Sequence, residues 1–296
     1  MVAVLNGELV EKDLKHLRIE NRGTTFADGL FEVVRILEGQ PVFLKDHYNR
    51  MKESAAFFSI PFHYTEKDVY SYADSLISRN RLPDGEFYIE LTRGPDEYRD
   101  HTYPEHPEPT FFILSLPLRK INRENWQKGV KLSIYPDLRH QLCEHKTINL
   151  LPNVMAKNFA YSTGAYDAMM FRKDERGRKY ITEGGSSTYF LIKDNRVVTP
   201  EVDNILPGIT RKKVINLCRR MEISVEERKV FLDEIDDADE AFLASTVSQV
   251  MPVRKIKDKD FPVIGETTKQ LMKRFTEMIN EEIDSMKKRD EGYDRV

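Results

Sequence analysis

Apolar residues recur along this chain at two spacings, and each spacing predicts a different kind of element. Alternation or short apolar runs indicate strands, whereas apolar residues three and four positions apart indicate helices. The dipeptide Asn6-Gly7, between two short runs, favours a tight hairpin. In this first part, strands are predicted over 2–5, 8–10, 86–92 and 110–116 and after Gly29, and helices over 46–58 and 68–79.

The remaining residues show the same mixture of periods. Strands are predicted over 129–136, 166–171 and 241–249 and in the run that ends at Ile192, and helices over 153–161, from 206–213 onward and over 268–286. In the first of these helices we expect Val154, Met155, Phe159 and Ala160 to face inward.

A polar stretch that begins at Pro117 separates the two parts and is typical of a connection between domains. We therefore predict a small N-terminal domain over 1–118, a linker over 119–125 and a larger C-terminal domain over 126–296. The mixture of helices and strands makes the expected fold class α/β in the broad sense, an α+β protein of two domains.

Composition excludes several classes of protein but does not by itself identify the function of this one. With 296 residues, 40% hydrophobic and 32% charged, the chain reads as globular, and its net charge of −3 gives no sign of a nucleic-acid or membrane partner. No apolar run approaches the roughly 20 residues that span a bilayer. Cys143 and Cys218 fall in no metal or redox spacing and suit a reducing compartment, so we expect a cytoplasmic protein without a metal.

Lys146 is the first candidate for chemistry. It lies between Cys143 and Asn153, where an extended stretch turns into a helix among small and apolar residues. Such surroundings can remove water from the amine, which disfavours the ammonium form and frees a nucleophile at neutral pH. A desolvated lysine of this kind can form a Schiff base. A single lysine is more often an ordinary surface residue, so the assignment depends on other motifs.

A second candidate is Glu183, which is followed by Gly184-Gly185, three hydroxyl residues and an apolar strand. The glycines let the backbone approach a ligand closely, and the glutamate could hold a cationic ring nitrogen. The alternative is a turn between strands with a solvated acid.

Phosphate-binding groups are predicted at the start of the helix that follows Gly208. The backbone N–H groups of Ile209 and Thr210 would point out of the helix, at the positive end of its dipole. Every helix starts in this way, so the signal is weak alone. Further donors could come from Ser245 and Thr246 after an apolar strand, and from Arg50, which lies off the apolar stripe of its helix.

The loop over 93–104 carries arginine, histidine and tyrosine residues. Arg99 and His101 are two positions apart, so in an extended segment both can point to one side and bind a carboxylate. A solvated loop is the alternative.

Taken together, these groups fit a pyridoxal-phosphate (PLP) site. PLP needs a Schiff-base lysine, an acid at its pyridinium nitrogen and a phosphate nest. Lys146 could then also carry the proton between the substrate Cα and the cofactor.

The chain resembles the fold-type IV PLP enzymes, which include D-amino acid aminotransferases, branched-chain aminotransferases and aminodeoxychorismate lyases. The resemblance extends from Asn6-Gly7 to about Phe275 and rests on six motifs in family order. These are Arg22-Gly23-x-x-Phe26-x-Asp28-Gly29-x-Phe31-Glu32, His47-x-x-Arg50, Lys146-x-x-Asn149, Glu183-Gly184, Pro207-Gly208-Ile209-Thr210-Arg211, and Ser245-Thr246 followed by Pro252-Val253.

The resemblance implies a homodimer with PLP between a small N-terminal α/β domain and a larger domain around a β-barrel-like sheet. It also implies a Schiff base on Lys146 and a pyridinium contact from Glu183. The cofactor-binding set that it implies comprises Arg50, Lys146, Glu183, Ser187, Ile209, Thr210, Ser245 and Thr246.

Within that family, Arg99-x-His101 looks like the α-carboxylate trap of D-amino acid aminotransferases, which reaches in from the neighbouring subunit. The implied reaction transfers an amino group from D-alanine or D-glutamate to a 2-oxo acid such as 2-oxoglutarate. Two departures stand out: Phe31 replaces the tyrosine usual in this substrate site, and Thr188 replaces a common asparagine. Tyr98 or Tyr103 could supply the missing hydroxyl. An L-branched-chain aminotransferase, an aminodeoxychorismate lyase and a non-enzymatic binding protein are the alternatives.

Overall fold

The computed structural model describes residues 1–12, 17–118, 122–261 and 264–293. By the packing of its backbone, the chain divides into two compact units. The N-terminal unit comprises Met1–Arg119, His145–Asn149 and Ile279–Val296, and the C-terminal unit comprises Lys120–Glu144 and Leu150–Met278. The segment around Lys146 therefore belongs to the N-terminal unit, although the sequence-based division had placed it in the larger domain.

The N-terminal unit is built on a six-stranded sheet in the order β2-β1-β6-β5-β3-β4. The predicted hairpin is confirmed, because Asn6 and Gly7 take positive φ angles between the first two strands. The strands are β1 (Val2–Leu5), β2 (Glu8–Glu11), β3 (Gly29–Leu37), β4 (Gln40–Pro41), β5 (Gly85–Thr92) and β6 (Thr110–Leu116).

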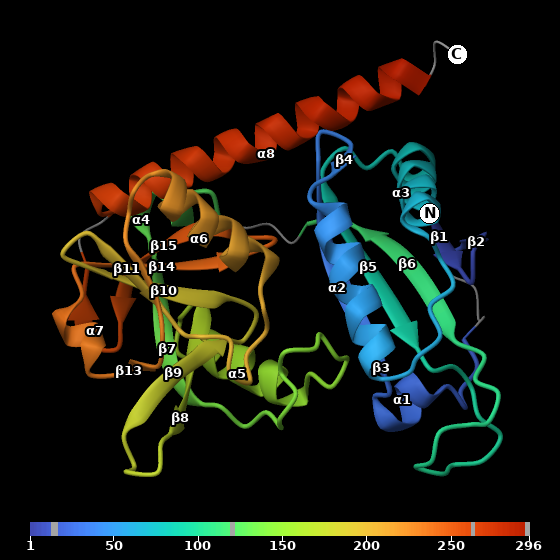
Figure 1. Ribbon diagram of the computed structural model, residues 1–296, viewed down its shortest axis with the longest axis horizontal. Helices are drawn as coiled ribbons and strands as arrows, with labels where there is room; N and C mark the ends of the chain where they lie inside the picture. The colour runs from blue at the N-terminus through green and yellow to red at the C-terminus, as the bar shows by residue number, and fades with distance from the viewer. Residues whose placement is uncertain (13–16, 119–121, 262–263, 294–296) are drawn as a thin grey trace. The chain divides into compact units, whose positions relative to one another are not determined.

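Two helices, α2 (Leu44–Phe57) and α3 (Glu66–Asn80), cover one face of this sheet (Figure 1). The core between them takes every second residue of β3 and β5, such as Val34, Phe87 and Ile89. The alternate residues, which include Phe31 and Tyr88, point to the other face. Part of the predicted loop before β3 is a short helix, α1 (Arg22–Phe26), capped by the Asn21 side chain.

The C-terminal unit contains a ten-stranded sheet in the order β12-β11-β10-β14-β15-β7-β8-β9-β13, with β16 paired to β15. The strands are β7 (Val130–Pro136), β8 (Asp167–Lys173), β9 (Lys179–Gly184), β10 (Thr188–Lys193), β11 (Arg196–Thr199), β12 (Val225–Glu227), β13 (Val230–Phe231), β14 (Glu240–Ser245), β15 (Gln249–Ile256) and β16 (Lys259–Asp260). The prediction of a mixed fold in two parts, with a curled sheet in the larger one, is confirmed.

The helices of this unit are α4 (Glu124–Lys128), α5 (Leu151–Ser162), α6 (Ile209–Arg220) and α7 (Glu234–Asp237). The long helix α8 (Glu266–Tyr293) starts in this unit and ends in the N-terminal one. Of the predicted linker 119–125, residues 119–121 lie outside the described residues, and Glu124 already begins α4. No helix in the described ranges is long and apolar enough to cross a membrane.

The predicted inward face of α5 is wrong for three of its four residues. Val154, Met155 and Phe159 are 59%, 45% and 38% exposed, whereas Ala156 and Ala160 are fully buried. The alanines form a small cluster with residues of β8, because the single methyl group of an alanine lets the helix backbone approach the sheet closely. The larger apolar residues of α5 therefore lie on the opposite side of the helix.

Candidate active site

The segment that carries Lys146 is joined to the start of β3 by backbone hydrogen bonds. The Phe31 N–H donates to the Lys146 carbonyl at 2.9 Å, and the Ile148 N–H donates to the Gly29 carbonyl at 3.1 Å. Gly29 is needed here, since a Cβ at this position would lie 2.9 Å from the Leu91 carbonyl and 3.0 Å from Ile148. Lys146 thus has a fixed backbone position beside Phe31.

The amine of Lys146 lies against the ring of Phe31, with Nζ 4.2 Å from the ring centroid. Although Lys146 keeps part of its surface accessible, desolvation of the amine lowers its pKa from 10.5 to about 8, and the nearby Arg50 charge acts in the same direction. Glu32 opposes these effects. At this pKa roughly a tenth of the Lys146 amine is uncharged at pH 7, far more than in a solvated lysine, in agreement with the predicted desolvation.

A buried acid lies between two basic side chains close to this lysine. The Glu32 carboxylate accepts hydrogen bonds from Arg50 Nε and Nη2, both at 2.7 Å, and lies 2.7 Å from His47 Nδ1. Burial alone would raise the pKa of Glu32, but Arg50 and His47 hold it at about 2. The structure therefore places Arg50, a predicted phosphate ligand, in a bidentate pair with Glu32; its contact with phosphate stays a prediction.

The lowered pKa of Lys146 has a measurable consequence in the protein freed of cofactor. Only the uncharged amine attacks an aldehyde, so the second-order rate of PLP uptake is expected to rise about tenfold per pH unit below pH 8 and to level off above it. Stopped-flow absorbance between pH 6 and pH 9.5 measures this profile. A rate that keeps rising through pH 9.5 would mean that the lysine has the pKa of a solvated amine.

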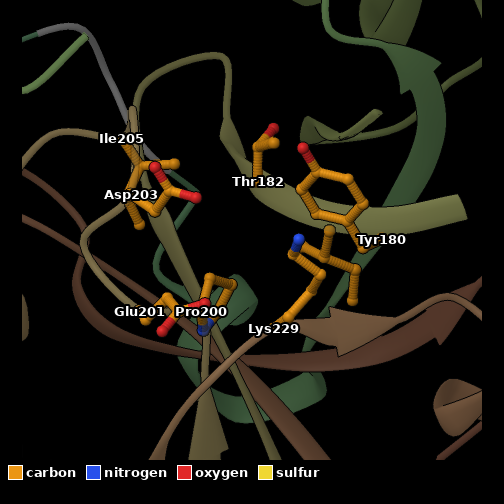
Figure 2. A pocket seen from close by; sticks show the side chains of 8 residues that line it. Tyr180, Thr182, Pro200, Glu201, Asp203, Ile205 and Lys229 are labelled. Carbon is orange, nitrogen blue, oxygen red and sulfur yellow. The ribbon is translucent and has the colours of Figure 1, made fainter. Parts of the chain in front are cut away.

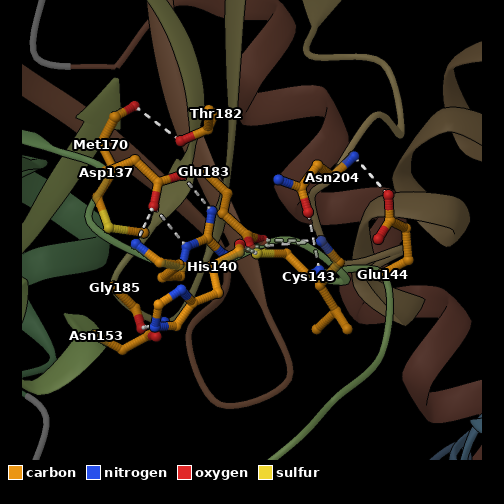
Figure 3. A network of polar contacts seen from close by, with 12 residues as sticks. Asp137, His140, Cys143, Glu144, Asn153, Met170, Thr182, Glu183, Gly185 and Asn204 are labelled. Atoms are coloured by element: carbon orange, nitrogen blue, oxygen red, sulfur yellow. Dashed lines mark hydrogen bonds and ion pairs between the residues drawn. The ribbon is translucent and has the colours of Figure 1, made fainter. Parts of the chain in front are cut away.

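Glu183, at the end of β9 in the C-terminal unit, is nearly buried (Figure 3). Arg139 and a backbone N–H hold its carboxylate. Arg139 Nη1 donates to Glu183 Oε1, and the Leu206 N–H lies 3.4 Å from both carboxylate oxygens. Asp137 anchors Arg139 with a 2.7 Å contact to Nη2 and also pairs with Arg172. Burial opposes ionisation of Asp137, but Arg139 keeps its pKa below the ordinary value.

The glycines after Glu183 fold over a second buried acid, Asp167. Ser187 Oγ donates to Asp167 Oδ2 at 2.6 Å, and the Gly185 N–H donates to Oδ1 at 3.2 Å. A Cβ on Gly184 would lie 2.5 Å from Ser187 Oγ, and one on Gly185 would lie 2.6 Å from Cδ of the Lys157 side chain. The hydroxyl proton of Ser187 is thus used within the loop, and its predicted contact with a cofactor stays a prediction.

Four of the predicted phosphate-binding residues lie near this loop in the same unit, whereas Arg50 belongs to the N-terminal unit. Helix α6 begins at Ile209, and its N-cap residue Gly208 has no side chain to occupy the first N–H groups. An added Cβ on Gly208 would be 3.3 Å from Thr188 Oγ1, and Thr188 pairs with Ala244 at the end of β14, next to Ser245 and Thr246. Ile209 and Thr210 are nearly buried, whereas Ser245 and Thr246 keep partial exposure.

A small pocket in this unit lies close to Glu183 but includes none of the predicted site residues. It is bordered by residues of β9 and of the loop after β11, among them Thr182, Asp203 and Ile205 (Figure 2). Lys229 closes one side and stacks on Tyr180, with Nζ 4.6 Å from the ring centroid.

In the N-terminal unit, Arg99 and His101 are brought together on one aromatic ring. The Arg99 guanidinium lies 4.7 Å from the Phe26 centroid, and the His101 ring lies 5.0 Å from it. Both side chains are exposed. Neither tyrosine considered as a substitute for the missing hydroxyl contacts Phe31: Tyr98 is 70% exposed, and Tyr103 covers the Arg93 guanidinium.

Buried ion pairs fix the base of this loop. Asp28 accepts from Arg22 Nε at 2.9 Å and from Arg93 Nε at 2.8 Å, and Arg22 also pairs with Asp96. Arg22 Nη1 donates to the Asp100 carbonyl at 2.8 Å, directly between Arg99 and His101. The exposed pair is therefore carried on an anchored loop.

Sequence reasoning missed Arg139 and its partner Asp137. The available signal was a pair of opposite charges directly after the apolar strand β7, where an unpaired charge would be costly. It could not indicate that Arg139 pairs with Glu183, which lies 44 positions away in the sequence.

Comparison with known proteins identifies the family. The profile of the family described as amino-transferase class IV matches residues 29–256. A D-alanine aminotransferase of Bacillus licheniformis is 36% identical over 86% of this chain and 88% of its own, and one of Staphylococcus epidermidis is 31% identical over 93% and 96%.

Solved structures give the same fold. A branched-chain amino acid aminotransferase of Escherichia coli superposes with a TM-score of 0.86 at 22% identity, covering 94% of each chain. A putative 4-amino-4-deoxychorismate lyase of Legionella pneumophila reaches 0.80 at 26% identity, covering 92% of this chain and 97% of its own. The chain belongs to the class IV aminotransferases, a family of PLP-dependent enzymes.

Proposed function

We propose that this protein is a D-amino acid aminotransferase that passes an amino group from D-alanine or D-glutamate to a 2-oxo acid such as 2-oxoglutarate. The observation that carries the proposal is the pair Arg99 and His101, held on the Phe26 ring by a loop with a buried ionic base. A guanidinium and an imidazole that pack against the same ring suit a substrate carboxylate. The D-alanine aminotransferases at 31% to 36% identity support the same substrate class.

Bound PLP supplies an electron-accepting ring that stabilises negative charge at the substrate Cα. Lys146 would hold the cofactor through its amine and would move the proton at the substrate Cα. Its lowered pKa suits both roles because the free amine is the reactive form. Glu183, paired with Arg139, would hold the proton on the ring nitrogen.

The other residues predicted to bind PLP differ in which part of the cofactor their chemistry suits. The free N–H groups at Ile209 and Thr210 suit the phosphate, with hydroxyl donors from Ser245 and Thr246 and a charge from Arg50. The glycines after Glu183 keep its loop packed tightly on Asp167 and Lys157, where an added Cβ would collide. The residues present thus fit each part of PLP.

We also infer a homodimer. The exposed side of α5 carries large apolar residues, with Leu151 69% and Val154 59% exposed, and contiguous apolar surface of this kind marks protein contacts. A second copy that covers α5 is the occupant expected from the family resemblance. The two free thiols agree with a cytoplasmic location.

An L-branched-chain aminotransferase is the second candidate. Phe31 favours it, since this position lacks the hydroxyl usual in the D-specific group, and solved enzymes of that class share the fold. Aminodeoxychorismate lyases share the fold as well and would release pyruvate without an amino acceptor.

Replacing Arg99 by alanine tests the proposed carboxylate contact. The KM for D-alanine is expected to rise about 10- to 100-fold, because a charge-assisted contact is lost, while the absorption band of the bound cofactor stays unchanged. Arg79→Ala, an exposed arginine on α3, serves as the control and should leave the KM unaltered. Turnover of L-leucine in the absence of any D-alanine turnover would contradict the proposed function.

A further inference from the structure

A tyrosine and an acid lie beside Phe31 on the sheet face that the core does not use. In the register of β3 with β5, Phe31 is opposite Glu90 and Val33 is opposite Tyr88, so all four side chains point to one face. The Tyr88 ring lies 5.7 Å from the Phe31 ring, and its hydroxyl donates to Glu90 Oε2 at 2.5 Å.

These residues are neighbours of the reactive lysine. Lys146 Nζ is 4.2 Å from the Phe31 centroid, Tyr88 lies next to Phe31, and Glu90 is bonded to Tyr88. All four belong to the N-terminal unit. Phe31 has no polar atom, so nothing in its side chain offsets a charge on Glu90.

Glu90 has no role in the fold that would explain a half-buried carboxylate. Its strand neighbours Ile89 and Leu91 fill the core on the opposite face. Within the described part of this unit Glu90 forms no ion pair, and burial raises its pKa against the opposing Tyr88 hydrogen bond. Burial, together with the same hydrogen bond, raises the pKa of Tyr88, so its hydroxyl stays a donor.

We propose that Glu90, held by Tyr88, sets the side-chain specificity of the transamination: it disfavours substrates with a second carboxylate and favours neutral or cationic ones. The inference rests on the proposed function, in which the substrate amine takes the place of the Lys146 amine. A substrate side chain directed toward the Phe31 ring would then meet the negative charge of Glu90, at a place partly shielded from water. The repulsion between like charges is strong where water is excluded. A binding site can use this repulsion to reject the wrong substrate.

The charge of Glu90 would narrow the set of amino donors and 2-oxo acid acceptors that the proposed function leaves open. D-Alanine is expected to be a better donor than D-glutamate, and a neutral 2-oxo acid a better acceptor than 2-oxoglutarate. D-Ornithine, which carries a cation in place of the second carboxylate, is expected to be accepted. Tyr88 acts as a positioning residue, because its hydroxyl fixes where the Glu90 charge lies.

Glu90→Gln tests this with little change of shape. Single-turnover reactions of the PLP-loaded enzyme with D-alanine, D-glutamate and D-ornithine give kcat/KM for each donor. The ratio of D-glutamate to D-alanine is expected to rise about 10- to 100-fold in the variant, and the ratio of D-ornithine to D-alanine to fall. Glu86→Gln is the matched control: it removes another half-buried acid of β5 that faces Arg35, farther along the strand from Phe31, and should leave both ratios unchanged.

Tyr88→Phe provides a second variant, which frees the carboxylate and is expected to shift the ratios in the same direction by a smaller factor. Equal ratios in the wild type, Glu90→Gln and Tyr88→Phe would overturn the inference while leaving the proposed function intact. A wild-type enzyme that turns over none of the three D-amino acids would overturn the proposed function, and the inference with it.

Discussion

Replacing Lys146 by alanine is expected to lower the rate of amino-group transfer by at least about 10⁴-fold. The change removes both the amine that binds the cofactor and the base that moves the Cα proton, and each contributes a large factor. Cofactor should still bind, since the phosphate and ring contacts do not include the lysine. Borohydride treatment should then no longer fix the cofactor to the chain, which mass spectrometry can measure.

The control is Lys45→Ala, an exposed lysine on α2 of the same unit, which should keep full activity. Addition of small amines such as methylamine should restore part of the activity of Lys146→Ala but leave the control unchanged, because an added base can enter the space of the missing side chain. Near-normal transfer by Lys146→Ala would show that another residue performs the chemistry.

Replacing Glu183 by glutamine is expected to lower kcat by about 10²- to 10³-fold with a smaller effect on KM. A neutral amide cannot hold a proton on the ring nitrogen, so the ring accepts electrons less well in the transition state. Arg139 would also face an uncharged partner and so favour an unprotonated ring. Rapid-quench kinetics separate this chemical step from binding.

Glu175→Gln, an exposed acid in the turn between β8 and β9 of the same unit, is the matched control. Thermal unfolding of both variants with and without cofactor reports whether a loss of activity has a structural cause. A Glu183→Gln enzyme with wild-type kcat would mean that the ring nitrogen is not protonated by this residue.

The elements could be predicted from the sequence because their signals are local. The hairpin at Asn6-Gly7, the strands β5 and β6 and the helices α3 and α6 follow from spacing within a few residues. The orientation of α5 could not be predicted in this way. Its large apolar residues look like a core face, yet the alanines pack inward and the large residues stay exposed.

Contacts within the candidate site depend on residues far apart in the chain. Glu183 was visible as an acid before glycines, but its pairing with Arg139 requires β9 to meet the segment after β7. The register of β3 with β5 likewise places Glu90 and Tyr88 beside Phe31, and no local pattern gives that register. Lys146 was predicted as a candidate from its motif, whereas its contact with Phe31 spans two segments of the N-terminal unit.

The most direct test of the central claim is a half-reaction with single enantiomers. The PLP-loaded protein is mixed separately with D-alanine and L-alanine, and with L-leucine, and the visible band of the bound cofactor is followed in time. Loss of the band with D-alanine, together with release of pyruvate and no change with either L-amino acid, is the predicted result. Loss of the band with the L-amino acids alone would contradict the account and make Arg99 and His101 a solvated loop.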